Sequence, residues 1–98
     1  MKPTDINITS LFSAMVVAEE IERNPRGAHA RAAARLELAP ASLSGRLREI
    51  ETGLGLALFE GKQRNRLTSA GEALLSCGPM LHRCCEAVIE TIQLAGDD

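Results

Sequence analysis

Apolar residues recur at intervals of three and four along most of this chain, which is the spacing of helices that bury one face. The pattern predicts a first helix over residues 8–22 and a second, alanine-rich helix over residues 28–37. A third helix is predicted to start at Pro40 and to end at Gly53 and Gly55. The chain is therefore expected to begin as three consecutive helices joined by short connections.

Residues with strong positional preferences mark the ends of these helices. Thr9 or Ser10 is the expected N-cap of the first helix. Pro40 suits the first position of the third helix, because a proline there lacks only an N–H that has no partner within the helix. The residues of the third helix that are predicted to face the core are Leu43, Leu47, Ile50 and Leu54.

Two short apolar stretches, LALFE and RNRLT, flank the polar sequence GKQ and predict a small two-stranded hairpin. A long helix is predicted from Ser69, with Thr68 as its N-cap or with Ser69 and Glu72 as a capping box. Pro79 lies inside this helix and is expected to kink it. One side of the helix carries a heptad seam that predicts a dimer interface of Leu74, Gly78, Leu81, Cys85, Val88 and Ile92.

These elements predict a mainly α fold, the winged helix-turn-helix: a three-helix core plus a small β-hairpin wing, followed by a long C-terminal dimerisation helix. Residues 1–68 are the predicted winged helix-turn-helix domain, and residues 69–98 are the linker and dimerisation helix of the same structural unit. The seam extends beyond what a body of this size can cover, which favours a homodimer through this helix. The alternative is that the helix folds back on the first helix of its own chain.

Composition argues against several other classes of protein. The chain has only two aromatic residues, both phenylalanine, and no apolar run near the ~20 residues that span a bilayer. We therefore expect an aliphatic core and no membrane partner. The N-terminus shows no hydrophobic signal segment, which predicts a cytoplasmic protein. Together with His82, the cysteines Cys77, Cys84 and Cys85 match no standard zinc spacing, so neither a metal nor another cofactor is expected.

The sequence shows no pattern of catalytic residues. His29 and Ser44 fall on separate predicted helices without a glycine elbow or a metal motif, so no catalytic residues and no enzyme are predicted.

The charge of the chain is unevenly distributed. The net charge is −2, yet residues 31–66 carry seven basic and four acidic side chains. A basic segment can bind phosphates even when the ends of the chain are acidic, because salt screens distant charges. The overall charge neither supports nor excludes DNA as a partner.

Three strings of this sequence resemble the N-terminal winged helix-turn-helix domain of LysR-type transcriptional regulators: LFSAMVVAEE, the run from GAHARAAARL to LGLALFE, and RLTSAGEALL. The pair LGLALFE and RLTSAGEALL is the most specific part of the resemblance. The winged-helix domain of molybdate-responsive regulators is an alternative that LGLALFE fits less well. The resemblance implies bacterial transcription regulation, with the third helix in the major groove of double-stranded DNA and the wing on the flanking backbone.

The resemblance also implies a dimer in which the long helices pack antiparallel and lead to an effector-binding domain. This chain stops before such a domain, so no small-molecule effector is expected. It is either a stand-alone DNA-binding protein or a piece of a longer regulator cut at the hinge.

Four features depart from the family pattern. The string IERNPR is inserted between the first two helices, His29 stands where phenylalanine is common, and the wing EGKQRNR is tighter, with Gly61 in place of a common arginine. Most important, the family's glutamine and arginine at the start of the third helix correspond to Pro40 and Gly45. Each such side chain is worth ~1–3 kcal/mol of base discrimination, so we expect relaxed sequence specificity. Ala39 as N-cap and Gly45 within the helix also weaken it, each by ~1 kcal/mol.

The candidate DNA-contacting residues combine the outer face of the third helix with nearby basic residues. Ser44 can bond to a base or a phosphate, whereas Pro40 and Ala41 offer apolar contact to a thymine methyl group. The arginines and the lysine suit phosphates better than bases. The full predicted set is Arg31, Pro40, Ala41, Ser42, Ser44, Gly45, Arg46, Arg48, Lys62, Arg64 and Arg66.

Arg35 is left out of this set because it is expected to pair with Glu37 or Glu49. The sequence thus predicts a dimeric DNA-binding transcriptional regulator of LysR-like type that lacks an effector-binding domain. The alternative is a protein-interaction module that heterodimerises with a full-length regulator and binds DNA weakly or not at all. This alternative is favoured by the acidic ends of the chain and by the third helix, which lacks long polar side chains at positions 40 and 45.

Overall fold

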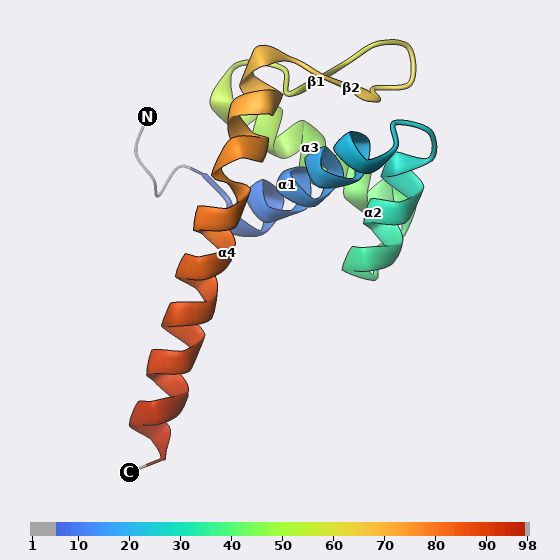
Figure 1. Cartoon of the computed structure of the whole chain (residues 1–98). Helices are drawn as coiled ribbons and strands as arrows, with labels where there is room; N and C mark the ends of the chain where they lie inside the picture. The colour runs from blue at the N-terminus through green and yellow to red at the C-terminus, as the bar shows by residue number, and fades with distance from the viewer. Residues whose placement is uncertain (1–5, 98) are drawn as a thin grey trace.

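The computed structural model describes residues 6–97, which form four helices and one antiparallel hairpin. Figure 1 shows the first three helices and the hairpin gathered into one body, from which the last helix extends alone. The mainly α winged helix-turn-helix fold with a long C-terminal helix is confirmed. The elements in chain order are α1 (Ile8–Arg23), α2 (Ala28–Leu36), α3 (Pro40–Leu54), β1 (Phe59–Glu60), β2 (Arg66–Leu67) and α4 (Ser69–Gly96). Residues 1–5 and 98 of the two predicted units lie outside the described residues.

The centre of the body is α1, whose middle is buried on all sides. Residues 13–18 are each at most 2% exposed, although three of these positions are occupied by serine or alanine. The sequence predicted one buried face for α1, but the buried surface is wider than that. The reason is that α4 packs on α1 in addition to α2 and α3. The alanines of α2 that face α1, Ala28, Ala32 and Ala33, are also buried and let the helices approach closely.

The N-terminus of α1 is capped by Asn7, a residue that was not predicted as its cap. The Asn7 side-chain oxygen accepts hydrogen bonds from the backbone N–H groups of Thr9 (2.9 Å) and Ser10 (3.3 Å). The expected cap at Thr9 or Ser10 is wrong, because the helix already begins at Ile8 and both residues lie inside it. Ser10 is instead buried in the body.

The starts of the other long helices follow the sequence expectations. Pro40 occupies the first turn of α3, and Ala39 provides no side-chain cap. At α4 the hydroxyl of Thr68 accepts from the Gly71 N–H (3.1 Å) and donates to the Ala57 carbonyl (2.7 Å). Thr68 therefore caps the helix and ties it to the chain before the wing, which confirms the Thr68 alternative.

The wing is a short antiparallel hairpin in which Phe59 pairs with Leu67 and Glu60 with Arg66. Leu58 and Phe59 are buried and anchor it to the body. Its turn contains two residues with left-handed backbone, Gly61 (φ 94°) and Arg64 (φ 55°). A left-handed conformation is ordinary for glycine but unusual for arginine, so something must hold Arg64 in place.

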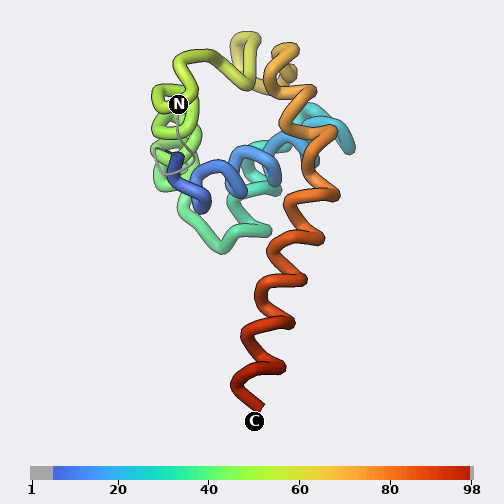
Figure 2. Tube along the Cα trace, turned by 90° about the vertical axis from the view of Figure 1, so that its left-hand side faces the viewer, coloured from blue at the N-terminus to red at the C-terminus, as the bar shows by residue number. Residues whose placement is uncertain are grey.

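The helix α4 lies against the body at two glycines and then leaves it. A Cβ atom at Gly71 would lie 2.2 Å from the Leu58 carbonyl oxygen, and one at Gly78 would lie 3.4 Å from the Met15 sulfur. Pro79 does not interrupt the helix, which runs on to Gly96. Figure 2 shows the red end of α4 pointing away from the wing. None of the described helices combines the length and the apolar character needed to cross a membrane.

The predicted dimerisation seam is divided along α4. Leu74 packs against the core of its own chain and Gly78 is buried against α1, so the fold-back alternative describes this first part of the helix. Beyond it Val88 is 57% exposed and Ile92 is 65% exposed. Leu81 and Cys85, between the two ends, are half-buried.

Candidate nucleic-acid interface

The outer face of α3 is open to solvent along its length. Pro40, Ala41, Ser42, Ser44, Gly45 and Arg48 are all exposed, whereas Leu43, Leu47 and Ile50 on the opposite face are buried. A Cβ atom at Gly45 would meet no neighbouring atom within 4 Å. The fold therefore leaves room for a larger residue at position 45, and Gly45 is not required by packing.

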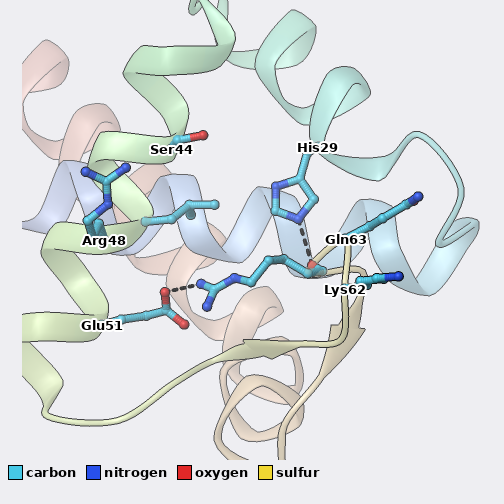
Figure 3. A pocket seen from close by; sticks show the side chains of 8 residues that line it. His29, Ser44, Arg48, Glu51, Lys62 and Gln63 are labelled. Atoms are coloured by element: carbon cyan, nitrogen blue, oxygen red, sulfur yellow. Dashed lines mark hydrogen bonds and ion pairs between the residues drawn. The ribbon is translucent and has the colours of Figure 1, made fainter.

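A cleft of about 440 Å³ separates this face of α3 from the turn of the wing. Figure 3 shows Ser44 and Glu51 pointing from α3 toward it and Arg48 beside them on α3. His29 on α2 and the wing residues Lys62 and Gln63 lie on its other side, the last two with their ends directed away from α3. Arg48 and Lys62 are exposed cations, and neither has an ion-pair partner among the described residues. The cleft thus places free positive charge and a hydroxyl group beside α3.

Arg64, the third cation at the cleft, is engaged within the protein. Its guanidinium forms an ion pair with the Glu51 carboxylate on α3 and lies 5.8 Å from the centre of the Phe59 ring. Its carbonyl oxygen lies 2.7 Å from Nε2 of His29. Glu51 is not among the residues predicted from the sequence, although a carboxylate directly after the core residue Ile50 is placed at the edge of the buried face of α3.

Two further arginines of the predicted set are held inside the body. Arg31 donates from Nε to the Glu20 carboxylate (2.8 Å), and its terminal nitrogens donate to backbone carbonyls at the end of α1 and in the loop after it. Arg46 is half-buried and donates to the Ser13 hydroxyl at 3.3 Å. Arg66, in contrast, lies exposed on β2. The structure thus brings Arg48, Lys62 and Ser44 together and directs Arg31 and Arg46 toward α1.

Arg35 is paired, but with partners on another helix. It donates to Glu19 (3.1 Å) and to Glu20 (3.0 Å), both on α1. The expected pairing with Glu37 or Glu49 is wrong, because α2 packs against α1 and turns Arg35 toward that helix. Arginines four residues apart on α2 thereby reach the same carboxylate on α1.

That carboxylate, Glu20, is fully buried and is the main polar group between α1 and α2. It accepts hydrogen bonds from Arg23, Arg31 and Arg35. The hydrogen bond from Arg31 holds the pKa of Glu20 below its ordinary value, against the opposing effect of burial. A glutamate within a run of buried α1 residues needs such partners, but which arginines provide them is decided by the packing of α2 against α1.

The second half of α4 and the start of α1 share an apolar surface. A shallow groove there is lined by Ile8, Leu81, Cys84, Cys85, Val88 and Ile89. The three cysteines are free thiols. Within residues 6–97, no three histidine, cysteine or carboxylate side chains lie together as metal ligands would.

Comparison with known proteins agrees with this architecture. Residues 25–72 match the family model described as "Bacterial regulatory helix-turn-helix protein, lysR family". The HTH-type transcriptional regulator PgrR of Escherichia coli (strain K12) is 47% identical over 77 residues, which are 76% of this chain and 24% of that protein. This chain therefore spans about a quarter of the length of that relative. No solved structure matches this chain significantly. The match over α2, α3 and the wing shows that this chain contains a helix-turn-helix domain of the LysR family.

Proposed function

We propose that this chain is a DNA-binding transcriptional regulator of LysR type, in which α3 enters the major groove and the wing lies on the adjacent sugar-phosphate backbone. The observation that carries the proposal is the cleft between α3 and the wing, where Arg48, Lys62 and Ser44 are together and accessible. Cations and hydroxyl groups in such a position suit phosphate oxygens. The membership of this segment in a family of bacterial regulatory proteins supports the same function.

The same face of α3 favours affinity over base discrimination. Pro40 and Gly45 are exposed at the end of α3 that would lead into the groove, and neither carries a hydrogen-bonding side chain. Base edges in the major groove are read by paired donors and acceptors, which leaves Ser42, Ser44 and Arg48 as the polar groups of this face. We therefore propose that phosphate contacts supply most of the binding free energy and that sequence selectivity is weak.

The proposed active form is a homodimer held by the second half of α4. Val88, Ile89 and Ile92 are each more than half exposed, and they continue the surface formed by Ile8 and Leu81. Burial of the apolar area that these side chains expose would stabilise an interface. Leu74 and Gly78 are left out of the proposed interface because they already contact their own chain.

The test of DNA binding is the salt dependence of affinity in the variant Arg48→Ala. The logarithm of the binding constant falls with the logarithm of salt concentration, with a slope of ~0.9 for each phosphate neutralised. Loss of Arg48 should reduce the slope by about that amount for each protomer, on any duplex sequence. The matched control is Arg83→Ala, since Arg83 is an exposed arginine on α4 away from the cleft, and it should leave the slope unchanged. Absence of affinity for duplex DNA at low salt would refute the proposal.

A second candidate function is favoured by the exposed apolar half of α4. A module that heterodimerises with a longer LysR-type regulator would need that surface and could dispense with α3. It predicts a stable complex with such a regulator and no DNA binding by this chain alone. The salt experiment separates the two functions, because only the first predicts a binding constant that depends on Arg48.

A further inference from the structure

We propose that Arg64 is a positioning residue that holds the wing, not a DNA-contacting residue, and that it does so together with Glu51 and His29. These three residues are called the wing brace below. The inference rests on the proposed function, because it concerns how the DNA-binding surface is held in shape. It changes the role predicted for Arg64 from its sequence.

The backbone N–H, the carbonyl oxygen and the guanidinium of Arg64 each form a bond within the protein. Its N–H donates to the Gly61 carbonyl across the turn (3.1 Å), and its guanidinium pairs with Glu51. Its carbonyl oxygen accepts from Nε2 of His29 at 2.7 Å. Because a carbonyl can only accept, Nε2 must carry the hydrogen in this contact. These bonds explain why an arginine adopts the left-handed φ of 55° here.

Glu51 fixes the other end of the wing as well. One carboxylate oxygen accepts from the backbone N–H groups of Leu58 (2.7 Å) and Phe59 (3.4 Å), and the other binds Arg64. Its side chain is 13% exposed, so these bonds are partly shielded from water. A single carboxylate on α3 therefore holds both the first strand and the turn of the wing.

The buried ring of Phe59 is the apolar surface against which two residues of the wing brace pack. The His29 ring packs edge-on against it with the centroids 5.9 Å apart, and the Arg64 guanidinium lies over it. A phenylalanine at position 29 could provide the ring contact but not the hydrogen bond to the wing. The departure at His29 thus adds a polar bond between α2 and the wing that the common residue cannot make.

The consequence for binding is a fixed distance between the cations on α3 and those on the wing. The charge of Arg64 is balanced by Glu51, which leaves Arg48 on α3 and Lys62 on the wing turn as the free cations at the cleft. A loop that is ordered before binding loses less conformational entropy on binding. The wing brace should therefore raise affinity without contributing a phosphate contact.

The decisive variant is Glu51→Gln, because the brace and simple electrostatics predict opposite signs. Removal of a negative charge beside the cleft should strengthen DNA binding if Glu51 and Arg64 act as charges alone. If they form the brace, the loss of the charge-assisted bonds should weaken binding by about tenfold. The matched control is Glu49→Gln, which removes an exposed carboxylate from the same helix outside the brace and should bind at least as well as the parent.

Two further measurements keep the inference separate from the proposed function. Arg64→Ala should weaken binding at one salt concentration but leave the salt slope unchanged, whereas a fall of ~0.9 per protomer would make Arg64 a phosphate contact. Without DNA, hydrogen exchange at the Leu58 and Arg64 amides should be about tenfold faster in Glu51→Gln and unchanged in Glu49→Gln. Tight wild-type binding with unchanged exchange would overturn the brace alone, and faster exchange without any DNA binding would overturn the proposed function alone.

Discussion

At the scale of single residues, Glu20 shows how a buried charge joins two helices of this fold. Its carboxylate is fully buried on α1, and Arg31 and Arg35 from α2 reach it across the helix interface. Arg31 also donates to the Glu20 carbonyl at the end of α1, so one guanidinium binds the side chain and the backbone of the same residue. The loss of these partners would destabilise the folded protein far more than the loss of a surface ion pair, because the carboxylate would stay buried without a compensating charge.

We expect Glu20→Gln to lower the free energy of unfolding by about 2–3 kcal/mol, because hydrogen bonds to a charged group are each worth ~1.5–3 kcal/mol and the amide cannot replace all of them. The measurement is urea denaturation at pH 7. Glu22→Gln is the control, since Glu22 is exposed on the same helix, and it should change stability by less than about 0.5 kcal/mol. Equal stability of the two variants would contradict this account of Glu20.

The stabilisation by Glu20 should also depend on pH in a defined direction. Its folded-state pKa lies below the ordinary value of 4.5, so the ionised form is favoured in the folded protein. The contribution is complete above pH 4.5 and is lost as the pH falls from there through the lowered pKa. Urea midpoints of the parent and Glu20→Gln should therefore differ by a constant amount at pH 6 to 8, and the difference should shrink as the pH falls below 4.5 toward the lowered pKa. A difference that does not shrink below pH 4.5 would assign the effect to packing.

Most residues whose role is local were predictable from the sequence, with the Asn7 cap of α1 as the exception, and residues whose role depends on tertiary contacts were not. Pro40 at the start of α3 and Thr68 at the start of α4 follow from backbone chemistry within one turn. Arg31 could not be distinguished from Arg48 by its neighbours, because the carboxylate that binds it lies eleven residues earlier on another helix. The role of Glu51 was not predictable for the same reason, because its bonds join three segments that meet only in the folded protein.

At the scale of whole elements, the long helix shows where a periodic pattern stops being informative. The apolar positions of α4 repeat regularly, yet Leu74 and Gly78 contact their own chain while Val88 and Ile92 are exposed. The heptad pattern has the same spacing in both parts, so it cannot show which part is covered by the body. The bounds of α1, α2 and α3 were predictable to within about two residues, because each is limited by a cap, a proline or a glycine.

Two helix glycines of this protein should respond in opposite ways to alanine. A Cβ atom at Gly71 would overlap the Leu58 carbonyl, so Gly71→Ala must push α4 away from the chain before the wing. We expect a loss of about 1–3 kcal/mol of stability. Gly45 is helical and surrounded by open space, so Gly45→Ala should gain ~1 kcal/mol through its higher helix propensity. Thermal unfolding of the two variants checks both signs, and a stabilised Gly71→Ala would show that α4 does not approach Leu58 this closely.

At the scale of the whole molecule, the arrangement separates two surfaces of different chemistry. The wing lies at one end, and the free end of α4 points away from it, as both views of the chain show (Figures 1 and 2). Cations gather at the cleft, whereas the exposed part of α4 carries Glu86 and Glu90 beside its apolar residues. An acidic segment held away from the cleft does not oppose phosphate binding once salt screens it. This separation is what permits a basic binding surface in a chain whose net charge is −2.

The same separation allows the proposed dimer to be tested through DNA binding. The double variant Val88→Glu and Ile92→Glu places charges on the exposed apolar side of α4 without touching the body, so it should be monomeric with an unchanged unfolding midpoint for the body. Sedimentation equilibrium measures the first expectation and circular dichroism the second. Gln93→Glu, an exposed change on a neighbouring side of the same helix, should remain dimeric.

Each protomer of a symmetric dimer contributes the same phosphate contacts, so the monomeric variant should bind DNA with about half the salt slope of the parent. Its affinity should fall by much more than half, because two linked sites bind far more tightly than either alone. Arg48→Ala combined with the double variant should then reduce the slope by ~0.9 rather than by twice that amount. A full slope in a protein shown to be monomeric would mean that one protomer makes all the phosphate contacts, and the second half of α4 would then have to serve another partner.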